Sequence, residues 1–291
     1  MMTLENMLLN NKIVNRFGVL AIMLLVVLPF AVSFTYALLY SFGFTGILSK
    51  GFTAGHVSSL LHSREVFFSL LYSFYIAVCS IVISLILAII GVLFFKTSIT
   101  KSKWSFFPYL PLALPSIVTA FISLQMFNKT GILARIAYQT NIINDLSQFP
   151  DIVNDKSAAG IIITHVLMAT PFFLIFFSNI YTAENVKDLS NVAKSLGASS
   201  GKVAEKIAVP LLLRKGINTV LLYFIFVFGS YEIPLILGRQ SPQMISVLIV
   251  RKMQRYNLMD IPQGYSLSLV YFIGVVLLLA VFLKSKNQEI S

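Results

Sequence analysis

Residues 191–210, with the sequence NVAKSLGASSGKVAEKIAVP, form the centre of a polar segment that joins two strongly apolar ones. Apolar side chains at helical spacing predict a short helix through Leu189, Val192, Ala193 and Leu196. Asp188 or Ser190 can cap the start of this helix, and Gly197 can adopt the left-handed conformation that ends many helices. The segment therefore predicts a short helix followed by a turn.

A second short helix is predicted directly after this turn. Ser199 or Ser200 can cap its start, and apolar side chains share one face at Val203, Ala204 and Ile207. Pro210 then marks the entry to the next apolar segment, since its fixed φ suits the first turn of a helix. The loop from Ala183 to Pro210 thus reads as a helix-turn-helix elbow with a flat surface suited to docking. The alternative is a pair of amphipathic helices lying on lipid headgroups.

The composition excludes a soluble globule. Hydrophobic residues make up 57% of the chain, charged residues only 11%, and the mean hydropathy is +0.85; soluble domains have about 25% charged residues. Long apolar runs separated by short charged links are typical of a helical bundle and lack the short alternating segments of a membrane β-barrel. We therefore expect an all-α, polytopic membrane helical bundle, with residues 1–291 forming a single transmembrane domain.

The apolar runs predict six transmembrane helices, near Gly18–Tyr40, Phe67–Phe95, Ser105–Phe127, Ala158–Thr182, Leu211–Leu237 and Gly264–Leu283. The first run is long enough to span the bilayer and lacks a small-residue cleavage site, so it is interpreted as an uncleaved N-terminal anchor. An even number of spans puts both termini on one side.

The distribution of Lys and Arg orients the chain. The connections on the side of both termini hold more of these residues than those on the other side, which predicts cytoplasmic termini. The elbow is then cytoplasmic, where nucleotide is available, and the connections Asn128–Ser157 and Gly238–Gln263 are external. The net charge of +11 is spread over both faces without a basic patch. Anionic membrane lipid explains it, and no nucleic acid partner is expected.

The spacing within the elbow resembles the EAA motif of ATP-binding-cassette (ABC) importer permeases. That motif reads Glu-Ala-Ala, three residues, Gly, nine residues, Ile, one residue, Leu-Pro. Four positions match it, namely Ala193, Gly197, Ile207 and Pro210, and three depart from it, namely Asn191, Val192 and Val209. Asn191 stands where the motif has Glu, which removes a carboxylate. The position of the elbow, two spans before the C-terminus, also matches the family.

The resemblance implies a type I ABC importer permease in a bacterial inner membrane. Its implied partners are two cytoplasmic ABC ATPase subunits, a second permease subunit, identical or related, and an extracytoplasmic substrate-binding protein. The chain would not be an enzyme and would bind no cofactor, because ATP and Mg²⁺ are held by the ATPase subunits. The implied ATPase-coupling residues are Asn191, Val192, Ala193, Leu196, Gly197, Ile207, Val209 and Pro210.

The sequence motifs agree with a non-catalytic role for this chain. Residues 197–203, GASSGKV, resemble a phosphate-binding loop, but the glycines are too close and the final hydroxyl is missing. The three histidines have no metal-ligand spacing, and Cys79 is the chain's single cysteine. His165, within the fourth span, is interpreted as a hydrogen-bonded core residue.

Glu232 is the only acidic residue within a predicted apolar span, and it lies beside Tyr231 and Pro234. An uncompensated carboxylate there is costly, so these three residues are candidates for the translocation path. The alternative for Glu232 is a structural ion pair with Arg239 or solvation at the membrane interface. The resemblance extends to the permeases of polyamine, sulfate, thiamine and ferric-iron importers. A polyamine substrate is our first expectation, since Glu232 would suit a cation.

Two other functional classes of membrane protein remain as alternatives. An ATP-independent secondary transporter or channel would be expected to carry more charges within its spans or visible repeats. An intramembrane enzyme would need a polar catalytic pair, for which Glu232 and His165 are the only candidates, and their predicted depths do not favour contact.

Overall fold

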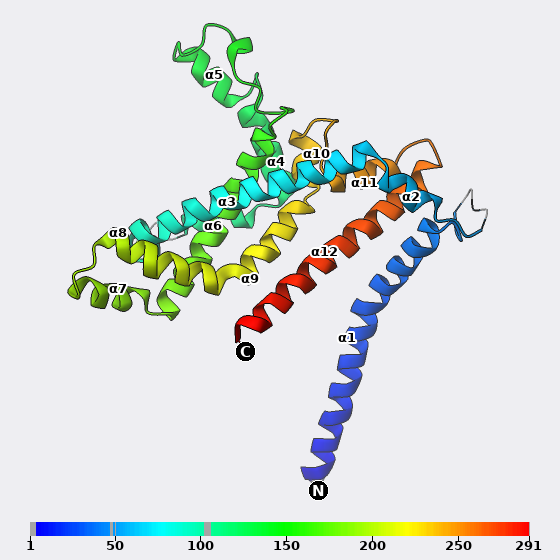
Figure 1. Ribbon diagram of the computed structural model, residues 1–291, viewed down its shortest axis with the longest axis horizontal. Helices are drawn as coiled ribbons and strands as arrows, with labels where there is room; N and C mark the ends of the chain where they lie inside the picture. The colour runs from blue at the N-terminus through cyan, green and yellow to red at the C-terminus, as the bar shows by residue number, and fades with distance from the viewer. Residues whose placement is uncertain (1–3, 47–48, 50, 102–105, 291) are drawn as a thin grey trace. The chain divides into compact units, whose positions relative to one another are not determined.

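The computed structural model describes residues 4–46, 49, 51–101 and 106–290, and this part of the chain is helical without strands. The helices are α1 (Leu4–Ser41), α2 (Gly55–Leu61), α3 (Arg64–Lys101), α4 (Ser116–Phe127), α5 (Ile132–Gln139), α6 (Ala159–Ala183), α7 (Val186–Ser195), α8 (Ser200–Val203), α9 (Val209–Phe228), α10 (Glu232–Leu237), α11 (Ile245–Met253) and α12 (Asp260–Ile290). Short 3₁₀ turns are η1 (Phe107–Tyr109), η2 (Pro111–Ala113) and η3 (Leu146–Gln148), and η4 (Ala204–Ala208) is a π-helical turn. Figure 1 labels the helices.

Six helical segments of the described chain are long and apolar enough to cross a membrane, as predicted. They are Gly18–Ser41, Arg64–Phe94, Ser116–Gln139, Ala159–Ala183, Ser200–Leu237 and Asp260–Ala280. The prediction of an all-α polytopic bundle is confirmed. Lys50 and Lys103, which contribute to the charge comparison between the two sides, lie outside the described residues.

The predicted start of the third span is wrong. Ser105 lies outside the described residues, and residues 106–115 form the turns η1 and η2 before α4 begins at Ser116. Three prolines in this stretch, Pro108, Pro111 and Pro115, lack the backbone N–H that a continuous helix needs. Pro115 adopts an extended conformation, with φ −58° and ψ 146°, at the N-cap of α4. Apolar composition alone does not reveal such a break.

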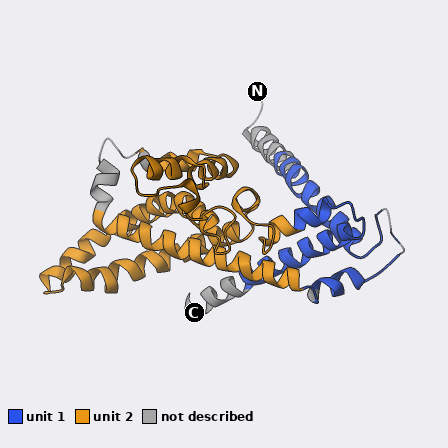
Figure 2. Ribbon diagram, turned by 90° about the horizontal axis from the view of Figure 1, so that it is seen from above, with its two compact units in different colours: residues 1–63, 249–291 blue, residues 64–248 orange. Residues whose placement is uncertain are grey.

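The described chain divides into two compact units, residues 64–248 and residues 1–63 with 249–291 (Figure 2). In the first unit α6 packs along α3, and α9 contacts both helices. One buried cluster includes Phe173, Phe177 and Leu212, and a second includes Ile76, Ile161 and Leu237. Because α6 contributes to both clusters, it is the central helix of this unit.

Glycine permits the close approach of α9 to α6. A Cβ atom on Gly216 of α9 would lie 2.6 Å from Cε1 of Phe177 and 3.1 Å from Cε1 of Phe176. Phe177 is fully buried. Small residues commonly permit such approaches between membrane helices, where van der Waals packing drives association.

The other unit consists of α1, α2 and α12, together with the end of α11. The ring of Tyr265 on α12 lies 4.6 Å from that of Tyr40 and 5.8 Å from that of Tyr36, both on α1. The buried hydroxyls of Ser41 and Ser266 are hydrogen-bonded at 2.6 Å. Aromatic packing and one polar contact therefore hold α1 against α12.

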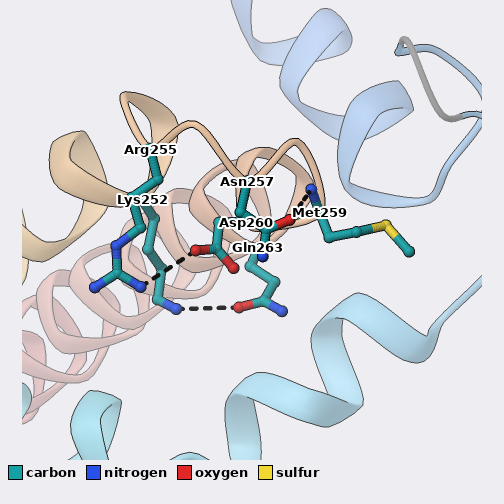
Figure 3. A network of polar contacts seen from close by, with 6 residues as sticks. All are labelled: Lys252, Arg255, Asn257, Met259, Asp260 and Gln263. Atoms are coloured by element: carbon teal, nitrogen blue, oxygen red, sulfur yellow. Dashed lines mark hydrogen bonds and ion pairs between the residues drawn. The ribbon is translucent and has the colours of Figure 1, made fainter.

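A polar network joins the end of α11 to the start of α12 (Figure 3). The buried Lys252 donates from Nζ to Oε1 of Gln263 at 3.0 Å, and Arg255 forms an ion pair with Asp260 at 3.2 Å. Asp260 lies in the first turn of α12, where the helix dipole stabilises a negatively charged carboxylate. All four residues belong to the unit that contains residues 249–291, and we assign these contacts a structural role in the turn before α12.

We expect Gly216→Leu to destabilise the packing of α9 against α6 by about 1–3 kcal/mol, because the new side chain must displace Phe177. Thermal unfolding of the purified protein checks this as a lower Tm. Gly274→Leu is the matched control, since a Cβ on this helical glycine of α12 meets nothing within 4 Å. An equal Tm for the two variants would contradict the packing role of Gly216.

Candidate functional site

The predicted elbow forms at one end of the unit that contains residues 64–248, where α6 leads into α7 (Figure 1). The expected cap of α7 is wrong, because the helix begins earlier, at Val186, after Asn185 in a left-handed conformation. Asp188 lies in the first turn, and Ser190 donates from Oγ to the carbonyl oxygen of Val186 at 2.6 Å. Val186 is fully buried and packs α7 against its surroundings, so tertiary contact rather than a side-chain cap sets the start of the helix.

The turn at Gly197 forms as predicted. Gly197 has φ +89°, and its N–H donates to the carbonyl of Lys194 at 2.9 Å, while the N–H of Ala198 donates to that of Ala193 at 3.0 Å. These two bonds make a Schellman motif, which satisfies carbonyls at the helix end. A Cβ at Gly197 would meet nothing within 4 Å. Glycine is therefore required for its backbone conformation and not for space.

The second half of the elbow continues into the membrane without a break. Ser199 is the cap of α8, as predicted, and its Oγ accepts from the N–H of Lys202 at 3.5 Å. The π-helical turn η4 then leads directly into α9, and Pro210 lies in the first turn of α9. A π turn widens the helix, so it accommodates a proline that lacks an N–H and crowds the preceding turn. The fifth span therefore reaches back to Ser200, eleven residues earlier than the predicted Leu211.

The elbow presents an apolar stripe to its surroundings. Leu189, Val192 and Leu196 of α7 share one face, with 47%, 59% and 83% of their surface exposed. The inner contacts are made instead by Val186, Val203 and Ala208, all of which are buried. A row of exposed apolar side chains on one helix face often marks a surface that binds a partner. We call Leu189, Val192 and Leu196 the elbow stripe.

The remaining predicted coupling residues lie around this stripe. Asn191, Gly197 and Pro210 are exposed, and Ala193, Ile207 and Val209 are half-buried. The predicted coupling residues thus lie on α7, on the turn after it, on η4 and on the first turn of α9. Its base is held by an ion pair between Glu184, after α6, and Lys215 of α9, at 2.9 Å.

The second group of predicted site residues lies where α9 ends. The helix breaks at Gly229, and α10 starts at Glu232 after Tyr231. Glu232 is half-buried in the first turn of α10, and Pro234 is buried. Within the described residues no ion pair joins Glu232 to Arg239. Its carboxylate is instead favoured by the N-terminus of α10.

A cavity of about 670 Å³ lies near α10, at the N-terminal end of α6. Sequence reasoning missed it, because its lining comes from three separate segments. The charged side chains that line it are Lys129, Asp151, Asp155, Lys156 and Arg239. The cavity and the elbow are at opposite ends of α6, whose 25 residues span about 37 Å.

No candidate for catalysis or metal binding emerges from the described residues. They contain no group of three metal-ligating side chains. His165 is buried, as predicted, but its Nε2 has no hydrogen-bond partner among them, and no contact links it to Glu232.

The comparisons with known proteins agree with this geometry. The sequence model of the family described as binding-protein-dependent transport system inner membrane component matches residues 51–285. The chain belongs to this family. It is an inner membrane permease of an ABC importer, a non-catalytic subunit whose ATPase is a separate subunit.

Solved permease structures share the fold. A bacterial ABC transporter that imports the acidic polysaccharide alginate matches with a TM-score of 0.66 at 16% identity, over 91% of this chain and 95% of the other. A second alginate transporter structure, in complex with an alginate-bound periplasmic protein, matches with a TM-score of 0.64 at 15% identity, over 91% and 94%. At this identity the match supports the fold alone.

Relatives of known sequence come from Salmonella. A Salmonella typhimurium protein, provisionally named the permease protein PhnV of a 2-aminoethylphosphonate transport system, is 29% identical over 270 residues, 90% of each chain. Its Salmonella typhi counterpart is also 29% identical, over 90% of this permease and 91% of the relative.

We expect Gly197→Ala to loosen the turn of the elbow, because a Cβ at φ +89° costs about 1 kcal/mol. Hydrogen exchange measured by mass spectrometry should show roughly fivefold faster exchange of the amides of residues 197–198. Gly201→Ala is the control, since this glycine has ordinary φ and open space around it. Unchanged exchange in Gly197→Ala would mean that the turn is held by other contacts.

Proposed function

We propose that this permease couples two cytoplasmic ABC ATPase subunits to solute import through the elbow stripe. The observation that carries the proposal is the exposure of Leu189, Val192 and Leu196 on a helix whose end is fixed by the Gly197 turn. A permease with no nucleotide site of its own must receive the free energy of ATP binding through a surface contact. An apolar stripe on a well-fixed helix suits such a contact.

The continuity of α8, η4 and α9 gives the proposal its mechanical basis. A displacement of the elbow is passed to the fifth span without a flexible joint, because the helix runs unbroken from Ser200 to Phe228. The ATPase subunits then act by binding one conformation of the permease more tightly than the other. Val203 and Ala208, which are buried, keep the two halves of the elbow moving together.

The rest of the proposed assembly follows from the orientation. With cytoplasmic termini the elbow faces the ATPase subunits, and the opposite end of α6 faces an extracytoplasmic substrate-binding protein. A second permease subunit, identical or related, completes the translocation path, and residues 1–291 act as one permease domain within membrane lipid. ATP and Mg²⁺ belong to the ATPase subunits, and this chain binds no cofactor.

For the solute we propose a small zwitterion of the 2-aminoethylphosphonate type. Two features support this choice, namely the printed names of the Salmonella relatives and the presence of both Glu232 and a group of basic side chains at one end of the unit. A polyamine, our first expectation from the sequence, would use Glu232 alone and has no support from the relatives. Glu232, with Tyr231 and Pro234, is proposed to contact the ammonium group of the solute in the translocation path.

Co-purification tests the coupling proposal. Leu196→Asp places a charge in the elbow stripe and should reduce the ATPase that co-purifies with the tagged permease in mild detergent by about tenfold or more. Lys187→Asp is the control, because it places the same carboxylate on α7 outside the stripe and changes the net charge even more than Leu196→Asp does. Mass spectrometry of the co-purified proteins would also identify any external binding protein.

Two results would contradict the coupling proposal. Equal recovery of the ATPase with Leu196→Asp and with wild type would remove the stripe from the interface. Recovery of the permease alone, active in liposomes without ATP, would favour the secondary transporter, with the elbow lying on lipid headgroups.

Glu232→Gln tests the translocation path. We expect it to raise the apparent KM for uptake of 2-aminoethylphosphonate about tenfold, because an ion pair with the ammonium group is lost, while ATPase co-purification stays unchanged. Spermidine competition in the same uptake assay separates the two solutes. An unchanged KM for uptake in the variant would contradict contact between Glu232 and the solute and would favour a structural role for this residue.

A further inference from the structure

The cavity at the N-terminal end of α6 has the size and the walls of a binding site for a small solute. Its volume of about 670 Å³ lies within the ~300–1,000 Å³ that ligand sites usually occupy. The lining residues come from the end of α4 and the segment after it, from residues 150–156, and from Arg239 after α10. All of them belong to the same compact unit.

The two carboxylates that line the cavity are engaged by the protein itself. Asp151 forms an ion pair with Lys129 at 2.9 Å. Oδ2 of Asp155 accepts from the N–H groups of Ser157 and Ala159, both at 3.0 Å, and from the hydroxyl of Ser157. Asp155 thereby fixes the start of α6. Asp151 therefore has a cationic partner, whereas Asp155 accepts only from neutral donors and keeps its negative charge in the lining.

The lining carries three cations, Lys129, Lys156 and Arg239, against two carboxylates, an excess of one positive charge. Arg239 and Lys156 have no ion pair or hydrogen bond within the part of the chain that the structure describes. Arg239 is half-buried, whereas Lys156 is exposed at the cavity mouth. A guanidinium that is partly removed from water and unpaired favours an anion, and its planar donors match the oxygens of phosphonate or carboxylate in pairs.

A buried tyrosine outside the cavity lining lies near Arg239. The hydroxyl of Tyr72 is buried and has no hydrogen-bond partner among the described residues. Tyr72 lies close enough to Arg239 and to Asp155 to interact electrostatically with both. Tyr72 is not among the residues that line the cavity, so its hydroxyl is not assigned as a ligand of the solute.

We propose that this cavity is a binding site for the phosphonate or phosphate group of a small solute, with Arg239 as its principal ligand and Lys156 at its mouth. The inference rests on the proposed import function, since a site at the end of α6 opposite the elbow would receive solute before it enters the translocation path. The concave shape fits a small molecule rather than the flat surface of a docked protein. The nearby carboxylates of Asp151 and Asp155 disfavour a larger polyanion.

Calorimetric titration of the purified wild-type transporter, without nucleotide, tests the site. Inorganic phosphate and 2-aminoethylphosphonate are the probes, and spermidine is the cation control. We expect saturable binding of both phosphorus compounds, weakened roughly tenfold or more by Arg239→Gln and less by Arg239→Lys, which keeps the charge. Arg135→Gln, which removes the same charge from α5 outside the cavity, should change the affinity by no more than about twofold.

Lys156→Gln provides a second variant at an exposed position, where misfolding is not expected. It should also weaken binding, and an unchanged affinity in both Lys156→Gln and Arg239→Gln would overturn the proposal. Absence of saturable binding to wild type would overturn it as well. Because the titration needs no ATP, its failure is distinct from a failure of ATPase coupling, which the elbow variants measure separately.

Discussion

The lack of water in the hydrocarbon core is the constraint on which this structure depends. Each backbone N–H and C=O within a span must be satisfied inside its own helix, so irregular backbone and charged side chains gather at the ends of helices. In the unit formed by residues 64–248 this places the Gly197 turn at one end of α6 and the basic cavity at the other. The 25 residues of α6 connect the two ends.

The backbone N–H and C=O groups at the turn of the elbow are hydrogen-bonded within the elbow, while its apolar stripe stays exposed. Schellman bonds at Gly197 and the Ser199 cap fix the angle between α7 and α8, while Leu189, Val192 and Leu196 stay exposed. The π turn before Pro210 lets α8 continue into α9. A surface helix joined to an unbroken span supports the proposed transmission of force from a separate ATPase. The departure from the family motif at Asn191 leaves this geometry intact, since Asn191 is exposed and away from the bonds that form the turn.

Sequence periodicity and composition predicted the spans and the turn well because both depend on local properties. An apolar run of sufficient length must be helical in a membrane, and a glycine at the end of an amphipathic segment readily adopts positive φ. The errors arose where tertiary contacts compete with local preference. Buried Val186 extended α7 beyond the expected caps, and prolines on both sides of η2 delayed α4 to Ser116.

The sequence alone therefore determined the all-α membrane class, the number of spans and the position of the elbow, since each follows from composition, length and spacing along the chain. Only the tertiary structure decided which face of α7 is exposed, that α8 and α9 form one helix, and that Arg239, Lys156 and Lys129 line one cavity. The physical reason is that exposure and charge balance depend on neighbours distant in sequence. Asp155 caps the start of α6 and Asp151 pairs with Lys129, and these contacts, which the sequence does not reveal, leave Arg239 without an ion-pair partner within the described residues.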